Sequence, residues 1–493
     1  MHVIERLSRR SALARMLMAG AGAAGLSACG SPARSGAAGS KPKPNFLFVL
    51  ADDLGWADPG CYGNTFIETP VIDRLAAEGM RFTDAYAAPV CSPTRSSIMT
   101  GQYTARTGIY DFIPGHWRPY AKLTPPPNRL ELAPEQITLA EALAPGGYVA
   151  ASIGKWHLGR QPTDQGFVAP PRGNEGLDAL PETFAQKVNA YAKANPGKRV
   201  GPLTRQAVQF MAANRDRPFL CFLSHHAVHI KCEARADLVR KYEEKAKTHE
   251  TVIYPVYAGM CEAMDESVGL CLETLDHLGL ADRTVVIFVS DNGGLIRMYT
   301  GEGPRVTTNA PLRAEKGTLY EGGIRVPLVI RWPGVTKPGS VCRWPVISND
   351  FMPTMLAMAG LAPRPGQVID GASLVPLLEG RDRLERDTLT WYYPTYHHST
   401  PAVAIRQGDW KLIEFHEDGR LELYNLAEDI GESNNLADAM REKAQALRAR
   451  LHAWLDSLKA PKPEPNPDYD PAKAGQWGRN PRVPPRKKTP PKQ

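Results

Sequence analysis

Two pairs of acidic and amide side chains follow strongly apolar stretches of the sequence. Asp52 and Asp53 come directly after one stretch, and Asp291 and Asn292 come directly after another. Carboxylate and amide oxygens suit Ca²⁺ or Mg²⁺ better than they suit zinc. Carboxylates a few ångströms apart repel one another strongly at a protein-like dielectric, and a divalent cation allows them all to stay ionised. Each pair alone fits an ordinary turn, but the two together predict a metal site.

A further candidate is the run Cys91-Ser92-Pro93-Thr94-Arg95. Pro93 suits the first turn of a helix, which would place Cys91 at the positive N-terminus, where an anion is favoured. Arg95 lies one helical turn further on and can point back toward Cys91. From these residues alone, Cys91 is either a buried thiol before a helix or a low-pKa thiolate nucleophile.

These groups need a scaffold that brings their segments together. The apolar stretches at residues 45–50, 218–223 and 284–290 predict strands that are buried on both faces, and helical patterns lie between them. Alternating strands and helices predict a mostly parallel sheet between layers of helices. Ligands of such sheets bind beyond the carboxyl ends of the strands, where the polar residues lie. We therefore expect an α/β catalytic domain over residues 45–385.

The pattern changes after this domain. Short strands and turns precede an amphipathic helical pattern near residues 440–458. Residues 386–460 are therefore expected to form a smaller α+β subdomain with an antiparallel sheet. Residues 461–493 are rich in proline and lysine, so we expect them to be disordered or to lie over the surface.

The net charge of +7 belongs to the two ends of the chain. Residues 1–28 carry +3 and residues 461–493 carry +5, which leaves about −1 for the rest of the chain. The expected folded part therefore lacks the bulk positive charge of a nucleic-acid-binding protein.

The N-terminus has the composition of a targeting segment. Basic residues precede a stretch of small apolar residues that ends in Leu26-Ser27-Ala28-Cys29. This run resembles a bacterial lipobox, in which Cys29 would be lipidated, and Arg9-Arg10 resembles a twin-arginine signal. An ordinary secretory signal is the alternative. We expect residues 1–28 to be a signal peptide and residues 29–44 to be a flexible tether.

The run at residues 91–95 matches the signature Cys-x-Pro-Ser/Thr-Arg, and a second signature matches residues 147–157. Further matches follow in the order Asp52-Asp53, Ala227-Val228-His229, Asp291-Asn292-Gly293, and Lys316 ahead of residues 320–325. Over residues 44–425 the chain therefore resembles the formylglycine-dependent type I sulfatases, including arylsulfatases and N-acetylgalactosamine sulfatases. The resemblance implies an alkaline phosphatase-like fold.

The resemblance also implies a role for each matching residue. Cys91 would be oxidised to formylglycine (3-oxoalanine), whose hydrate attacks sulfur with one hydroxyl and helps expel sulfate with the other. The implied ligands of Ca²⁺, with Mg²⁺ as the alternative ion, are Asp52, Asp53, Asp291, Asn292 and residue 91. The implied catalytic residues are Arg95, which orients residue 91; Lys155 and Lys316, which hold sulfate oxygens; His157, which moves a proton at residue 91; and His229, which protonates the leaving oxygen.

Three functions fit these residues. The first is an exo-acting sulfatase on a sulfated galactose or N-acetylgalactosamine unit. The second is a phosphonate or phosphate ester hydrolase of the same superfamily, and the third is a lipoprotein that binds sulfated glycans without cleaving them. The loops at residues 109–120 and 392–398 are candidates for holding the leaving group.

The resemblance and the targeting segment together imply partners and a location. The expected partners are a sulfated saccharide and a maturing enzyme, either the formylglycine-generating or the anaerobic type. Nucleic acid is not expected, and the membrane would be contacted only through the lipid on Cys29. The expected location is the bacterial periplasm or cell surface.

Overall fold

The structure is a computed structural model, and it describes residues 43–251, 253–297 and 304–483. The predicted signal peptide, Cys29 and nearly all of the predicted tether lie outside these residues, so the expectations for export and lipidation stay predictions. Among the described residues, no helix combines the length and the apolar character needed to span a bilayer.

The main sheet has the strand order β5-β6-β1-β7-β8-β2-β9 in the described part of the chain. Its strands are β1 (Asn45–Ala51), β2 (Met80–Phe82), β5 (Val149–Gly154), β6 (Phe219–Ser224), β7 (Thr284–Ser290), β8 (Leu328–Arg331) and β9 (Ser340–Cys342). The neighbours β5, β6, β1 and β7 are all parallel, whereas β8 pairs antiparallel with both β7 and β2. The predicted, mostly parallel sheet is confirmed, and the three strands expected from the sequence are β1, β6 and β7.

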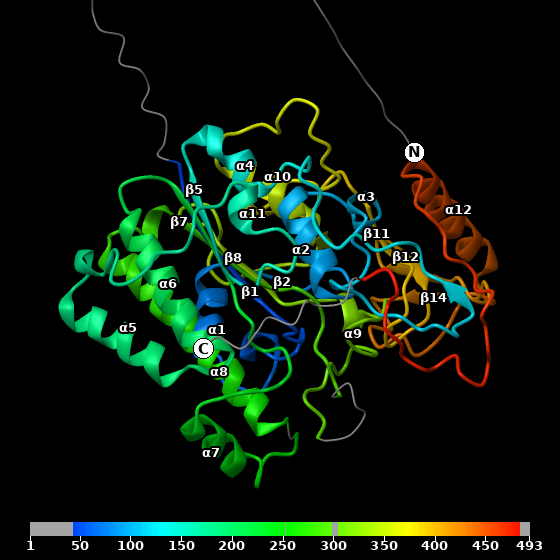
Figure 1. The fold of residues 1–493 in the computed structure, drawn as a ribbon, viewed down its shortest axis with the longest axis horizontal. Helices are drawn as coiled ribbons and strands as arrows, with labels where there is room; N and C mark the ends of the chain where they lie inside the picture. Colours follow the sequence, from blue (N-terminus) through cyan, green and yellow to red (C-terminus); the bar gives the residue numbers. More distant parts are fainter. Residues whose placement is uncertain (1–42, 252, 298–303, 484–493) are drawn as a thin grey trace, which may run out of the picture. The chain divides into compact units, whose positions relative to one another are not determined.

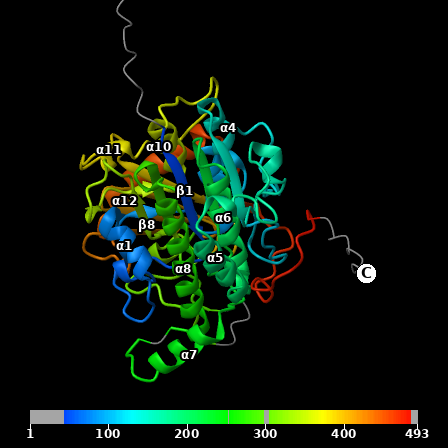
Figure 2. The same ribbon diagram turned by 90° about the vertical axis from the view of Figure 1, so that its left-hand side faces the viewer.

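Helices cover both faces of this sheet because its central strands are apolar on both sides. In β1, Leu47 and Val49 belong to one hydrophobic cluster, and Phe46 and Phe48 belong to another. Figures 1 and 2 show the two helical layers. Within each layer, neighbouring helices contact one another. One layer contains α1 (Pro70–Glu78), α5 (Glu182–Ala194), α6 (Val200–Ala213), α7 (Ala236–Lys245) and α8 (Pro255–His277). The other contains α2 (Cys91–Thr100), α4 (Leu139–Leu143), α10 (Phe351–Met358) and α11 (Val375–Leu378).

A second, antiparallel sheet follows in the C-terminal part of the chain, as the sequence predicts. Its strands are β11 (Thr388–Tyr393), β12 (Ala402–Gln407), β13 (Trp410–Phe415) and β14 (Leu421–Asn425), in that order. Helix α12 (Arg441–Ser457) covers one face, where Leu447 and Leu451 pack against Val403 and Ile405. The other face packs against the rest of the fold through Trp391 and other apolar residues. Short elements complete the fold: α3 (Thr104–Thr107), α9 (Glu321–Ile324), β3 (Ala85–Tyr86) and β10 (Val346–Ile347).

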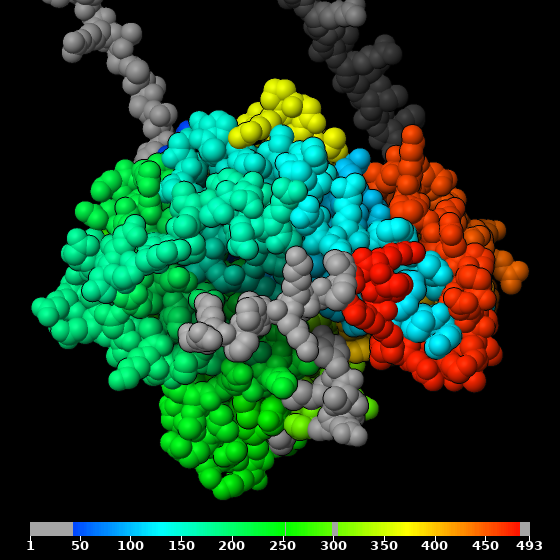
Figure 3. Space-filling view, viewed as in Figure 1, coloured from blue at the N-terminus to red at the C-terminus, as the bar shows by residue number. Residues whose placement is uncertain are grey.

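The segment after α12 lies over the surface. The composition allows disorder here, but residues 461–483 follow a defined path because the backbone finds partners. Strand β15 (Glu464–Pro465) pairs with β4 (Leu123–Thr124), and Asn466 Nδ2 donates to Pro119 O and Ala121 O at 2.9 and 2.7 Å. Figure 3 shows the red C-terminal atoms against cyan atoms of the earlier chain. Residues 484–493 lie outside the described residues.

Candidate active site

The topology of the main sheet brings the predicted polar residues to one place. Strand β1 lies between β6 and β7, with Leu50 opposite Ser224 and Ala51 opposite Ser290. The residues that follow these strands therefore meet at the carboxyl edge. The side chains that gather there are almost completely buried: Asp52, Asp53, Ser224, Asp291 and Asn292.

The two strand ends are tied together by hydrogen bonds. The backbone N–H of Asp53 donates to Asp291 Oδ1 at 3.2 Å, and Asn292 Nδ2 donates to Asp53 Oδ1 at 2.8 Å. Asp53 has a left-handed backbone conformation with φ of 67°, which is uncommon for a residue other than glycine. The hydrogen bonds with Asp291 and Asn292 hold Asp53 in this conformation at the sheet edge.

Three cations face the three carboxylates. Lys155 Nζ lies 2.6 Å from Asp52 Oδ2, and Lys316 Nζ lies 2.9 Å from Asp53 Oδ2. Burial alone would raise the pKa values of Asp52 and Asp53, but these lysines hold both well below the usual range. The pKa of Asp291 is instead raised to about 6 by burial and by repulsion from Asp52. Asp291 is therefore the carboxylate whose charge is least compensated, even with Arg95 beside it.

Arg95 supplies the cation for Asp291. Its Nε and Nη2 atoms donate to Asp291 Oδ2 at 3.0 and 2.6 Å, and Nη1 donates to Lys155 O at 2.7 Å and Ser224 Oγ at 2.5 Å. The sequence places Arg95 one turn from residue 91 and suggests that it points back to Cys91. These four hydrogen bonds direct the guanidinium to the sheet edge, where several acceptors lie together, and Arg95 is still close enough to interact with Cys91. Arg95 therefore joins α2 to the ends of β5, β6 and β7.

Cys91 is the first residue of α2, as predicted, and its side chain lies beside a histidine. The Cys91 Sγ atom is 3.3 Å from His157 Nδ1, and His157 Nε2 is 2.6 Å from Ile113 O. Because a carbonyl oxygen only accepts, Nε2 carries the proton and Nδ1 is free to accept one. Burial, with Lys155 nearby, lowers the pKa of His157 to about 4, so the ring is neutral at neutral pH. Burial also raises the pKa of the Cys91 thiol, which disfavours a thiolate nucleophile.

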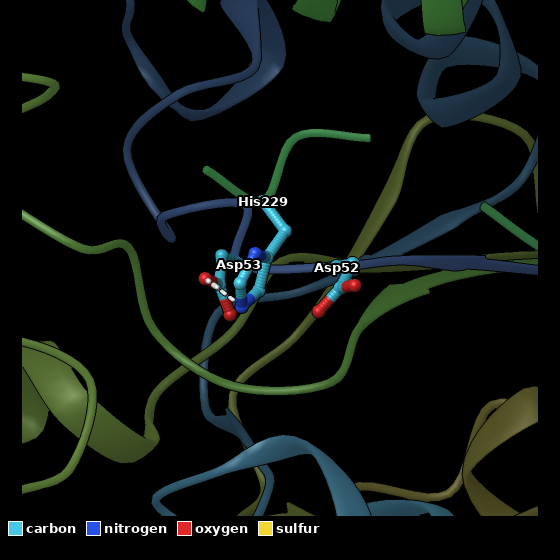
Figure 4. Close-up of side chains that lie close together, drawn as sticks. All are labelled: Asp52, Asp53 and His229. Atoms are coloured by element: carbon cyan, nitrogen blue, oxygen red, sulfur yellow. Dashed lines mark ion pairs between the residues drawn. The ribbon is translucent and has the colours of Figure 1, made fainter. Parts of the chain in front are cut away.

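His229 lies beside Asp53 (Figure 4). Its Nε2 atom is 3.6 Å from Asp53 Oδ2, and its Nδ1 atom is 2.5 Å from Ile230 O. Nδ1 therefore carries a proton, and Nε2 faces the site. Asp52, Asp53 and His229 place one ligand atom each within 4.8 Å of one another, so His229 lies in the cluster although the sequence suggests no metal role for it.

A cavity of about 520 Å³ opens over this cluster. Its lining includes the predicted residues Asp52, Cys91, Lys155, His157, His229 and Lys316. Part of the predicted loop at residues 109–120 also lines it, namely Phe112, Ile113, Pro114 and His116.

Two further cavity residues were not predicted as site residues. His226 is the neighbour of buried His225, and Lys198 lies in a turn before α6 with φ of 49°. Only the packing of α6 against β5 and β6 brings Lys198 to the site, so the sequence carries no signal for it.

The donor atoms present fit an oxygen-bound cation. The Asn292 Nδ2 atom donates to Asp53 and to Gly293 O at 2.9 Å, which fixes the orientation of the amide. The Asn292 Oδ1 and Asp52 Oδ1 atoms are buried and have no hydrogen-bond partner among the described residues. Such acceptors are costly unless something else binds them. Carboxylate and amide oxygens are ligands for Ca²⁺ or Mg²⁺.

A mostly parallel sheet that gathers acidic side chains and cations at one carboxyl edge has its ligand site where open α/β sheets usually have it, and it agrees with the alkaline phosphatase-like fold that the sequence resemblance implies. Comparison with known proteins defines the family more closely. Residues 44–361 match the family model "Sulfatase", and residues 314–461 match the model "N-sulphoglucosamine sulphohydrolase, C-terminal". The chain belongs to the sulfatase family, and it is a sulfuric ester hydrolase.

Individual relatives agree with this assignment. Human arylsulfatase A is 33% identical over 480 residues, which cover 86% of this chain and 90% of the relative. The N-acetylgalactosamine-6-sulfatase of the dog is 30% identical over 405 residues, which cover 77% of this chain and 73% of the relative. The crystal structure of Ps i-CgsB in complex with k-i-k-neocarrahexaose matches with a TM-score of 0.68 and 26% identity, covering 87% of this chain and 94% of that one.

Proposed function

We propose that this sulfatase removes sulfate from sulfated saccharides, using residue 91 as formylglycine and a Ca²⁺ ion at the carboxyl edge of the sheet. The observation that carries the proposal is the position of residue 91. It is the first residue of α2, it lines the cavity, and it lies 3.3 Å from a histidine nitrogen that can accept a proton. The positive end of α2 also favours the anionic sulfate group near residue 91.

The residues around residue 91 suit an anionic ester. Asp52, Asp53, Asp291 and Asn292 would hold the cation together with residue 91. When bound, Ca²⁺ would offset the carboxylate charges and polarise an oxygen of the ester. Lys155 and Lys316 line the same cavity and can donate to sulfate oxygens.

Two histidines that line the cavity would handle protons during the reaction. As a hydrate, formylglycine supplies a geminal diol, of which one hydroxyl attacks sulfur and the other assists sulfate release. His157 has an acceptor nitrogen directed at residue 91, so it can take a hydroxyl proton there. His229 has Nδ1 committed to a carbonyl and Nε2 facing the cavity beside Asp53, so its imidazolium form would donate a proton from Nε2 to a leaving oxygen.

The named relatives support a saccharide as the substrate. The dog enzyme is named for N-acetylgalactosamine, and the Ps i-CgsB complex contains a neocarrahexaose. We therefore propose exo-acting removal of sulfate from a galactose-type or N-acetylgalactosamine-type unit. The balance of charge at this site would also suit a phosphate ester, so phosphate and phosphonate esters belong in the test.

The test has two readouts on protein from a host that contains a maturing enzyme. The tryptic peptide of residues 82–95 should lose about 18 Da relative to the cysteine form. The same protein should release sulfate from some of a panel of sulfated saccharides and aryl sulfates, and faster than phosphate from matched phosphate esters.

Two variants serve as controls. Cys91→Ala should abolish sulfate release, and Cys61→Ala should not, because Cys61 lies outside the cavity lining. The proposal fails if formylglycine is present and no sulfate is released, or if Cys91→Ala remains active.

A further inference from the structure

A second cavity adjoins the catalytic one. It has a volume of about 600 Å³, and its lining includes His116, Arg118, Glu315, His397, His398 and Trp477. His116 lines both cavities. The two are also joined through Lys316, because His398 Nδ1 is 2.9 Å from Lys316 O. The two cavities are therefore neighbours that share a wall residue.

Trp477 gives the second cavity an aromatic wall that comes from the C-terminal segment. Its side chain is 49% exposed although it contacts two cavity residues. The ring centroid lies 4.8 Å from that of His116 and 4.1 Å from the Arg118 guanidinium carbon. Arg118 covers one face of the indole, so the apolar surface that stays exposed is the part that suits the C–H face of a pyranose ring.

The segment around Trp477 is held against the predicted mouth loop. Gly478 N donates to Trp117 O at 2.9 Å, and β15 pairs with β4 further back along the chain. These contacts fix the backbone on both sides of Trp477. The indole is therefore held in place before a ligand arrives, which lowers the entropic cost of binding.

Arg118 is the cation of this cavity. Its guanidinium lies over the rings of Tyr396 and Trp477, and Nη2 donates to His397 O at 3.0 Å. Within the described ranges, no carboxylate forms an ion pair with Arg118. Glu315 is in the same cavity, but its Oε2 atom accepts from Ile296 N at 2.6 Å. A planar guanidinium that no carboxylate pairs with at close range suits a sulfate or carboxylate group on a ligand, and Glu417 acts on its charge only from further away.

We propose that Trp477, Arg118 and His116 form a binding subsite for the saccharide unit next to the one that loses its sulfate. The neighbouring sugar stacks on Trp477, and an anionic substituent of that sugar, sulfate or carboxylate, binds Arg118. This proposal rests on the proposed saccharide sulfatase function. It assigns substrate selectivity to the C-terminal segment, which lies beyond both family-model matches.

Kinetics on matched substrates test the subsite. Three oligosaccharides share the scissile sulfate and carry a sulfate, a carboxylate or no charge on the neighbouring unit, and a small aryl sulfate serves as the reference. For Trp477→Ala, the ratio of kcat/KM on each oligosaccharide to that on the aryl sulfate should fall about tenfold, mainly through KM. For Arg118→Gln, the ratio should fall about tenfold only for the charged neighbours, and the larger loss identifies the anion that Arg118 binds.

Two matched controls lie in the same segment outside the cavity lining. Tyr469→Ala removes another exposed aromatic side chain, and Arg482→Gln removes another arginine that lies over an indole ring. Both should keep the wild-type ratios. If Trp477→Ala has the same kcat/KM ratios as Tyr469→Ala, the stacking role of Trp477 is overturned. If Arg118→Gln loses kcat/KM equally on oligosaccharides with charged and neutral neighbouring units, the anion-binding role of Arg118 is overturned. If the wild type cleaves the aryl sulfate but no oligosaccharide, the saccharide function itself fails.

Discussion

The Asn292 side chain offers a direct test of the proposed cation. Its Nδ2 atom is committed to two acceptors, so its Oδ1 atom is a buried acceptor with no hydrogen-bond partner in the described structure, as is Asp52 Oδ1. A buried acceptor left unsatisfied costs about 1–3 kcal/mol. Ligation of both oxygens would therefore relieve roughly 2–6 kcal/mol. This relief should appear as stabilisation of the folded protein by Ca²⁺.

The size of the stabilisation follows from mass action. Calcium at 100 times its dissociation constant stabilises a folded protein by about 2.7 kcal/mol. A chain of 493 residues unfolds with an entropy of roughly 1 kcal/mol per kelvin, so Tm should rise by about 3 °C. Asn292→Leu keeps a similar volume but removes the oxygen ligand. If the affinity falls about a hundredfold, about 0.4 kcal/mol remains, and the shift drops below about 1 °C.

Calorimetry on chelator-treated protein, titrated with Ca²⁺ and separately with Mg²⁺, measures these shifts. Asn349→Leu is the matched control, because Asn349 is also buried with unpartnered side-chain atoms but lies in the turn before α10 and not at the end of β7. It should keep the wild-type calcium shift even if its own Tm differs. Equal calcium shifts in both variants, or no shift in the wild type with either ion, would refute the assignment of Asn292 as a ligand.

Three further outcomes are expected. Arg95→Met leaves the buried Asp291 carboxylate without its partner and should destabilise the protein by about 3–5 kcal/mol in thermal unfolding. Arg95→Lys should recover part of this loss. Unchanged stability of Arg95→Met would contradict the pairing of Arg95 with Asp291. Burial is the main reason why the pKa of Glu432 is raised from 4.5 to about 7. The native state therefore binds this proton more tightly than the unfolded chain does. The free energy of unfolding should fall as the pH rises from about 4.5 to about 7. Denaturant unfolding at pH 5 and pH 8 should therefore show a smaller decline for Glu432→Gln than for wild type, and an equal decline would count against Glu432. Gly154 precedes Lys155, has φ of +107°, and would place a new Cβ 1.9 Å from Ser224 O. Gly154→Ala should therefore lower both the sulfatase kcat/KM and the stability. Wild-type kcat/KM and stability in this variant would show that the turn at Gly154 does not position Lys155.

The sequence predicts the sheet and the ends of its strands because those features are local. The apolar run of β1 and the acidic pair after it lie next to each other in the chain, so the local pattern of apolar and polar residues predicts both. The order of the strands is not local, and the meeting of Asp53 with Asn292 depends on β7 lying beside β1.

The contacts that the sequence does not predict join distant segments. Arg95 bonds to Asp291 across 196 positions, and no periodicity within α2 indicates that partner. Trp477 reaches His116 through a proline-rich segment whose composition is also typical of disorder. Packing between segments decides both contacts, and local propensity carries no information about them.

The burial of α2 sets an order of events. All ten residues from Cys91 to Thr100 are buried, and Cys91 itself is only 2% exposed. Once this helix has packed, it would exclude a maturing enzyme that has to hold the segment around Cys91 in its own active site. If residue 91 becomes formylglycine, the oxidation therefore has to occur on the nascent or still unfolded chain. A chain exported in the folded state would then leave the cytoplasm with its aldehyde already made.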